Sequence, residues 1–154
     1  MFDGNMASRV IYQTLAADTT LMALVSAVVE DIYGKTITAP SAAFPFIAFN
    51  VMNQEDQYYN GAVRSLVESQ VLIRAIDAFD TANMSGDSTY SGTIQTIASR
   101  IDTLLHDKTI AIMDGAVQVG TATITRVSPF RERYLDGSVE YRHLGGVYHI
   151  NTNE

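Results

Sequence analysis

The feature that most constrains the fold is one strongly amphipathic stretch flanked on both sides by β-forming segments. Across residues 94–105, apolar side chains recur at the spacing of a single helical face. These residues are Ile94, Ile97, Ala98, Ile101, Leu104 and Leu105. The pattern predicts a helix that ends near His106, where a basic side chain suits the helix dipole. A turn and helix cap are predicted just before it, at residues 85–88.

Two helices are predicted at the start of the chain. Apolar residues at helical spacing indicate a first helix over residues 6–15. Asp18 or Thr19 is well placed to cap a short second helix that carries Leu21, Leu24 and Val25. Both helices have one apolar face, so each needs a surface to pack against.

The remaining segments predict strands. Those before the long helix are expected over residues 28–33, 46–52 and 66–78, and those after it over residues 110–113, 117–127 and 141–150. Asn60-Gly61, Asp114-Gly115 and Asp136-Gly137 predict the turns between strands. We therefore expect one domain, residues 1–154, of the α+β class. Its sheet is mixed and mainly antiparallel, with helices packed on one face.

Composition excludes several classes of protein. The 154-residue chain has no cysteine, which removes disulfides, thiolate metal sites and thiolate catalysis. A net charge of −7, from 17 acidic and 10 basic residues, argues against a protein that holds nucleic acid by its phosphates. No apolar run approaches the roughly 20 residues of a membrane span, and the N-terminus lacks a secretory pattern. The expectation is a protein made in a cytoplasm, with no membrane partner.

No catalytic or metal-binding pattern stands out in the sequence. His143 and His149 are separated by an even number on one predicted strand, so both could lie on one face. No spaced carboxylate completes a metal site, and two histidines on a half-exposed strand are the more ordinary interpretation. Asp77 and Asp80 fit a strand that runs into a solvated loop better than a catalytic pair. We predict no catalytic, metal or cofactor-binding residues and no cofactor.

Two groups of residues are candidates for contacts with a partner. Arginine and tyrosine are common energetic anchors of protein interfaces, and a charged share of only 18% makes this surface easier to desolvate. The candidates are Gln54, Tyr58 and Tyr59 near the first predicted hairpin, and Arg126, Phe130, Arg131, Arg133, Tyr134 and Arg142 near the chain end. Two alternatives stay open: the first group can be a plain hairpin tip, and the second can merely balance Glu132, Asp136 and Glu140.

Several segments read in order resemble a known family. They are Asp31-Ile32-Tyr33-Gly34, Phe44-Pro45-Phe46-Ile47-Ala48-Phe49, the strand Glu68 to Ala75 around Gln70, the helix end Ile101 to Leu105, and the closing segment Tyr141 to Ile150. This succession resembles the tail-completion, or tail-terminator, proteins of long-tailed bacteriophages. The resemblance covers nearly the whole chain and rests on order and pattern. The region from Asp107 to Gly120 is more elaborate than the family pattern.

The resemblance implies a structural role in a virion, in the phage tail or neck. Family members form a ring, usually a hexamer, that caps the tail tube and stops its polymerisation. The implied partners are further copies of the chain, the tail-tube protein and a head-tail connector or stopper protein, with DNA only passing through the lumen. The alternatives are another neck or tail-tube protein of related fold and, less favoured, a small ligand-binding domain or enzyme. We expect acidic residues to face the lumen, because an acidic channel holds few phosphates.

Overall fold

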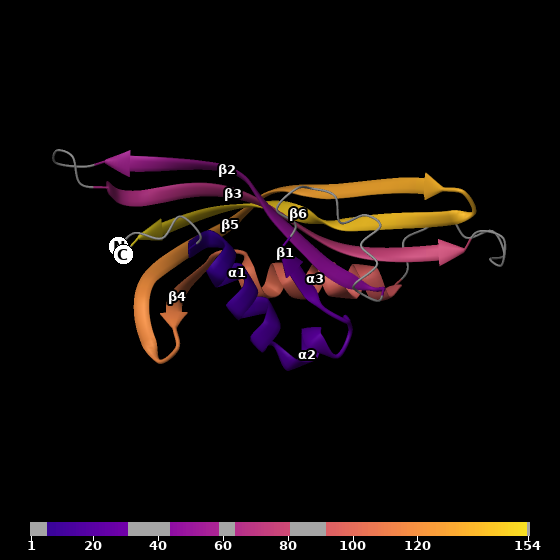
Figure 1. The fold of residues 1–154 in the computed structure, drawn as a ribbon, viewed down its shortest axis with the longest axis horizontal. Coiled ribbons are helices and arrows are strands. Elements are labelled where there is room, and N and C mark those ends of the chain that lie inside the picture. The colour runs from indigo at the N-terminus through magenta and orange to yellow at the C-terminus, as the bar shows by residue number, and fades with distance from the viewer. Residues whose placement is uncertain (1–5, 31–43, 59–63, 81–91, 154) are drawn as a thin grey trace.

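A computed structural model of the chain describes residues 6–30, 44–58, 64–80 and 92–153 (Figure 1). The helices are α1 (Met6–Ala17), α2 (Thr19–Met22) and α3 (Gly92–Leu105). The strands are β1 (Val28–Glu30), β2 (Phe46–Tyr58), β3 (Arg64–Asp80), β4 (Lys108–Asp114), β5 (Val117–Asp136) and β6 (Val139–Asn153). The predicted signals at Asn60-Gly61 and residues 85–88 lie outside the described residues, as do residues 31–33 of the first predicted strand.

The six strands form one sheet in the order β1-β2-β3-β6-β5-β4. Only the β1–β2 pair is parallel, and the other four pairs are antiparallel. The predicted mixed, mainly antiparallel sheet is therefore confirmed. Strands contain far more residues than helices, so the α+β class describes the fold only roughly. All three helices lie on one side of the sheet, which curves toward them where β4 pairs with the start of β5 (Figure 1).

Alternation along the strands gives the sheet two faces. On the helix-covered face, β3 contributes Val71, Ile73 and Ala75 to the main core, where they pack with the buried side of α1 and α3. The predicted apolar face of α3 is confirmed, because Ile94, Ile97, Ile101 and Leu105 are buried. The opposite face carries a smaller buried cluster formed by Phe46, Ala48 and Ile76. Burial on both faces explains why the start of β2 is apolar at nearly every position.

Three predicted boundaries were wrong. The second helix ends at Met22, before Leu24 and Val25. The segment 53–58, expected to belong to a turn region, continues β2 and pairs with β3. Likewise, β5 does not end at Val127 but runs to Asp136, and it is paired with β6 from Thr121 onward. In both strands a long-range partner satisfies the backbone of residues whose side chains are mostly polar.

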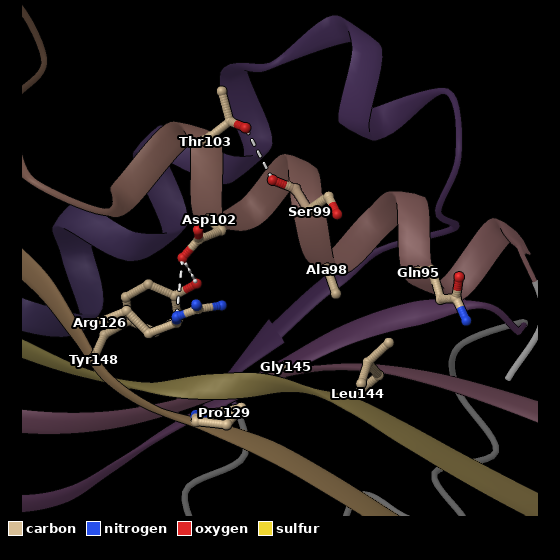
Figure 2. Close-up of a pocket in the computed structure, with 10 residues that line it drawn as sticks. All are labelled: Gln95, Ala98, Ser99, Asp102, Thr103, Arg126, Pro129, Leu144, Gly145 and Tyr148. Atoms are coloured by element: carbon tan, nitrogen blue, oxygen red, sulfur yellow. Dashed lines mark hydrogen bonds and ion pairs between the residues drawn. The ribbon is translucent and has the colours of Figure 1, made fainter.

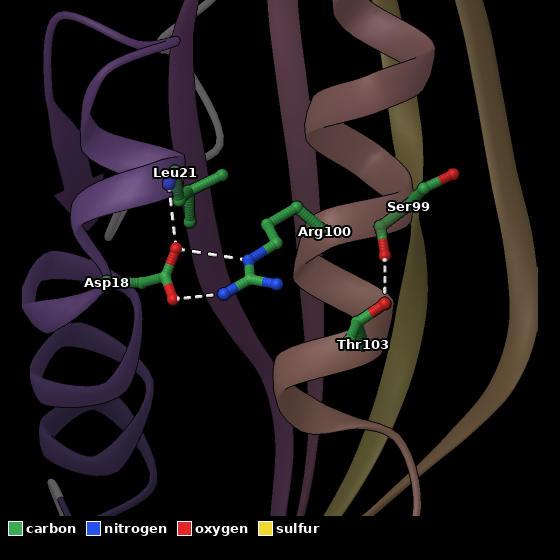
Figure 3. Close-up of polar contacts among 5 residues, drawn as sticks. All are labelled: Asp18, Leu21, Ser99, Arg100 and Thr103. Carbon is green, nitrogen blue, oxygen red and sulfur yellow. Dashed lines mark hydrogen bonds and ion pairs between the residues drawn. The ribbon is translucent and has the colours of Figure 1, made fainter.

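An ion pair between Asp18 and Arg100 links the N-terminal helices to α3 (Figure 3). Asp18 caps α2 by accepting a hydrogen bond from the Leu21 amide at 2.7 Å. The same carboxylate accepts two hydrogen bonds from Arg100, from Nε at 3.1 Å and from Nη2 at 2.6 Å. The Arg100 hydrogen bond, aided by the Leu21 amide, holds the pKa of Asp18 below its usual value. Asp18, one of the two residues predicted to cap this helix, is confirmed in that role.

Asp18→Ala is expected to lower the free energy of unfolding by about 1–2 kcal/mol, since α2 loses its cap along with the contact to α3. Because the folded pKa is lowered, the carboxylate stabilises the protein above its unfolded pKa, and this contribution is lost as the pH falls below about 4. Urea denaturation at pH 7 measures the loss. Asp18→Asn, which keeps a capping oxygen, should lie between the alanine variant and the parent. Equal stability of all three proteins would contradict the assignment.

Candidate assembly surfaces

The predicted histidines and Asp77 do not form a catalytic constellation. His143 is buried, and its Nδ1 lies 3.4 Å from Nη1 of Arg74. His149 is half-buried and borders a small hollow of about 90 Å³ beside Glu55 and Glu68. Asp77 accepts a hydrogen bond from the next backbone amide, that of Ala78. Among the described residues, no group of three histidine, aspartate or glutamate side chains could hold a metal ion.

The first candidate contact group lies on the hairpin arm formed by the end of β2 and the start of β3. This arm projects from one end of the sheet (Figure 1). Gln54 is exposed on β2 opposite Ser69. Tyr58 is the last residue of that strand, and Tyr59 lies outside the described residues. The described part of this arm is strand pairing between β2 and β3 up to Tyr58.

The second candidate group lies on another arm, at the other end of the sheet, where β5 pairs with β6 and β6 pairs with the end of β3 (Figure 1). Arg131 and Arg133 are exposed on β5, and Phe130, which precedes them on the strand, is half-buried. Tyr134 is 44% exposed and lies beside Tyr141, with ring centroids 6.3 Å apart. The arm thus presents cationic and aromatic side chains together.

Arg142 differs from the rest of this group because it is buried. Its Nη2 donates to Oε2 of Glu140 at 3.3 Å, and Arg133 donates through Nε to the other carboxylate oxygen at 2.5 Å. The two arginine hydrogen bonds outweigh burial and hold the pKa of Glu140 below its usual value. Charge balance within the arm, one of the two interpretations left open by the sequence, therefore accounts for Arg142.

Arg126 lies at the root of the same arm, on the rim of a groove between α3 and the β5–β6 pair (Figure 2). Its Nε is 3.4 Å from Oδ1 of Asp102, and the Tyr148 hydroxyl donates to the same oxygen at 3.2 Å. Burial, reinforced by Asp102, raises the pKa of Tyr148 well above its usual value. The groove, about 550 Å³, is open and is also lined by Ser99 and Leu144. The periodicity of the sequence did not predict this groove, because the groove depends on how α3 packs on the sheet.

Two glycines lie where the backbone of a neighbouring strand comes close. A Cβ at Gly145 would meet the Ile73 carbonyl oxygen on β3, and one at Gly120 would meet the carbonyl oxygen of Asn153. Gly115 and Gly137 have positive φ angles of 61° and 62°, as the two predicted turns require. The described helices include none long and apolar enough to cross a membrane.

Comparison with known proteins identifies a shared fold. No protein-family model matches the chain, and no curated protein matches it in sequence. Among solved structures, a chain from the structure titled "Virion of native gene transfer agent (GTA) particle" aligns with a TM-score of 0.54 and 14% identity. The alignment covers 99% of this chain and 100% of that chain. The likeness is therefore one of whole folds rather than of a single shared motif.

Proposed function

We propose that this chain is a structural subunit of a phage-like virion rather than an enzyme. The observation that carries the proposal is the end-to-end match of its fold to a chain of a gene transfer agent virion. The side chains on which chemistry could depend take part in the packing of the sheet: His143 lies beside Arg74, and Asp77 accepts a hydrogen bond from the Ala78 amide. The chemistry favoured by the described residues is surface recognition.

Within the virion, we propose the role of tail terminator. Copies of the chain would form a ring, usually of six, that caps the tail tube and ends its polymerisation. The other side of the ring would meet the head-tail connector or stopper protein, and DNA would pass through the lumen. The order of motifs along the chain supports this role. It is also supported by the two arms at opposite ends of the sheet, because a closed ring needs two different contact patches on each subunit.

The proposed contacts follow from the two arms. One patch contains Gln54, Tyr58 and Tyr59, and the other contains Arg126, Phe130, Arg131, Arg133 and Tyr134. Arg142 is left out because its side chain is buried within its own subunit. We propose in addition that several acidic residues face the lumen, where they would let DNA pass without binding it. A lumen lined with lysine and arginine would contradict this part.

Purified protein, examined with and without the tail-tube protein, tests the role. A terminator should form one or two stacked rings in negative-stain images, and light scattering should give the mass of a closed ring. Long tubes formed by the protein alone would instead identify a tail-tube protein of related fold. A chain that stays monomeric in both samples and contacts no virion component would overturn the proposal.

The enzyme alternative has its own test. Alanine at His143, His149 and Asp77 removes the side chains on which that alternative depends. If tail assembly survives each substitution in a folded variant, these residues give the enzyme interpretation no support.

A further inference from the structure

The outer edge of β5 is open along more than half of the strand. This 20-residue strand pairs with β6 on one side from Thr121 to Asp136. On its other side, β4 pairs only with residues Val117–Ile124. From Thr125 to Asp136, no described strand covers the outward backbone groups. Such an edge is a template for another strand.

A second open edge lies on the other side of the sheet. The described residues of β1 pair with Ile47–Phe49 of β2 and with no other part of that strand. Farther along, the stretch Asn53–Tyr58 pairs with β3 on its inner side and has no described partner strand on its outer side. The strand order therefore leaves two different open edges, one on each side of the same sheet.

The directions of the two strands suit a head-to-tail contact. Three antiparallel steps lead from β2 through β3 and β6 to β5, so β5 runs opposite to β2. A second copy placed beside the first in the same orientation brings its β2 antiparallel to β5. The open stretches lie toward opposite ends of the sheet, which requires strands inclined to the ring axis, as in closed barrels. This is a heterologous contact, the type that closes rings.

Hydrophobicity favours burial of the β5 edge. At the end of β5, Leu135 is 65% exposed beside Tyr134, and exposed apolar side chains supply surface to bury. Net charge does not select the partner edge, because residues 130–136 contain two arginines and two carboxylates and Arg133 is already bonded to Glu140.

The pairing stretch of β5 can be narrowed further. A bulge interrupts the strand between Arg126 and Ser128, and Pro129 has no backbone donor. Both features hinder strand addition. The regular part of the open edge therefore begins at Phe130 and ends at Asp136.

We propose, building on the ring function proposed above, that neighbouring copies join by strand addition. Residues 130–136 of β5 pair antiparallel with residues 53–58 of β2 in the next copy. The two sheets become continuous across the subunit boundary. The contact is made by the backbone, and the opposite directions of β2 and β5 set its orientation.

Engineered cysteines test the pairing directly, because the natural chain contains none. Gln54 pairs with Ser69, so its side chain lies on the helix-covered face of the sheet. Arg131 pairs with Leu144 on that same face, and Arg133, two residues later, also lies there. Side chains opposite one another on adjacent strands have Cβ atoms about 4.5–5.5 Å apart, close enough for oxidation to a disulfide after a small adjustment. The test mixes Gln54→Cys protein with Arg131→Cys, Arg133→Cys or Leu135→Cys protein, assembles rings on the tail-tube protein and oxidises them.

The matched control uses Glu55→Cys with the same three partners. Glu55 is also exposed, but alternation puts it on the opposite face, where it cannot meet them. We expect at least one Gln54 pair to give about tenfold more cross-linked dimer than its Glu55 control. Rings that form but show equal cross-linking in both sets would overturn strand addition and leave the terminator function standing. Absence of any ring would overturn both.

Discussion

Gly145→Ala is expected to lower the free energy of unfolding more than alanine at Gly115 or Gly146. Gly145 lies on β6 directly beside β3, in the middle of the sheet. An added Cβ would meet the Ile73 carbonyl oxygen and would lie 2.7 Å from the Cα of Arg74. Both obstacles are backbone atoms of a central strand, so neither can rotate away. The two strands must separate, and we expect a loss of about 3 kcal/mol or more in the free energy of unfolding.

Two other glycines provide matched controls. Gly115 has a positive φ of 61° with nothing within 4 Å of an added Cβ, so Gly115→Ala should cost about 1 kcal/mol through backbone strain alone. At Gly146 the nearest atom, 3.0 Å away, belongs to the flexible Arg126 side chain, so crowding should be milder there. Urea denaturation followed by circular dichroism ranks the three variants. A Gly145→Ala protein as stable as the Gly115→Ala protein would show that the strands are not this close.

The parts of the fold that sequence predicted are those in which local periodicity and burial agree. The helix α3 has four isoleucine or leucine positions that are buried on one face, and β3 alternates as expected from Val67 to Ala75. The two turns with Asp-Gly signals are present because positive φ at Gly115 and Gly137 is a local requirement. In each of these elements the signal is contained within a few neighbouring residues.

The parts that sequence missed depend on partners far along the chain. Residues 53–58 and 128–136 are mostly polar on both faces, so no alternation marks them as strands. They are held by pairing with β3 and β6 respectively. The candidate contact residues lie on these same two arms, so their grouping was predictable and their extended geometry was not. The burial of Arg142 follows from its place on β6 between β3 and β5, where Glu140 of the same strand accepts its hydrogen bond.

The burial of His143 is a further feature that the sequence did not predict, and it should make the stability of the protein depend strongly on pH. Its place on one strand with His149 follows from spacing, but its complete burial follows from packing against β3. Burial, and then the nearby positive charge of Arg74, lower the pKa of His143 to about 4. The folded protein therefore holds a neutral imidazole at pH values where the unfolded chain, with its ordinary pKa near 6.5, is already protonated.

We expect the protein to lose about 3 kcal/mol of stability through His143 as the pH falls from about 6.5 to 4. In that interval the unfolded state binds more protons than the folded state, so acid favours unfolding. The interval lies above the range in which the lowered pKa of Asp18 acts, so the two contributions can be separated. Denaturation midpoints measured at a series of pH values follow the effect.

His143→Gln removes the titrating group and should flatten the stability profile between pH 6.5 and 4. The substituted amide remains polar and can still accept a hydrogen bond from Arg74, which lies beside the imidazole. His149→Gln is the matched control, because His149 is on the same strand and only half-buried. Its profile should keep the slope of the parent protein. A His143→Gln protein that keeps the slope of the parent would contradict the role of His143 in acid sensitivity.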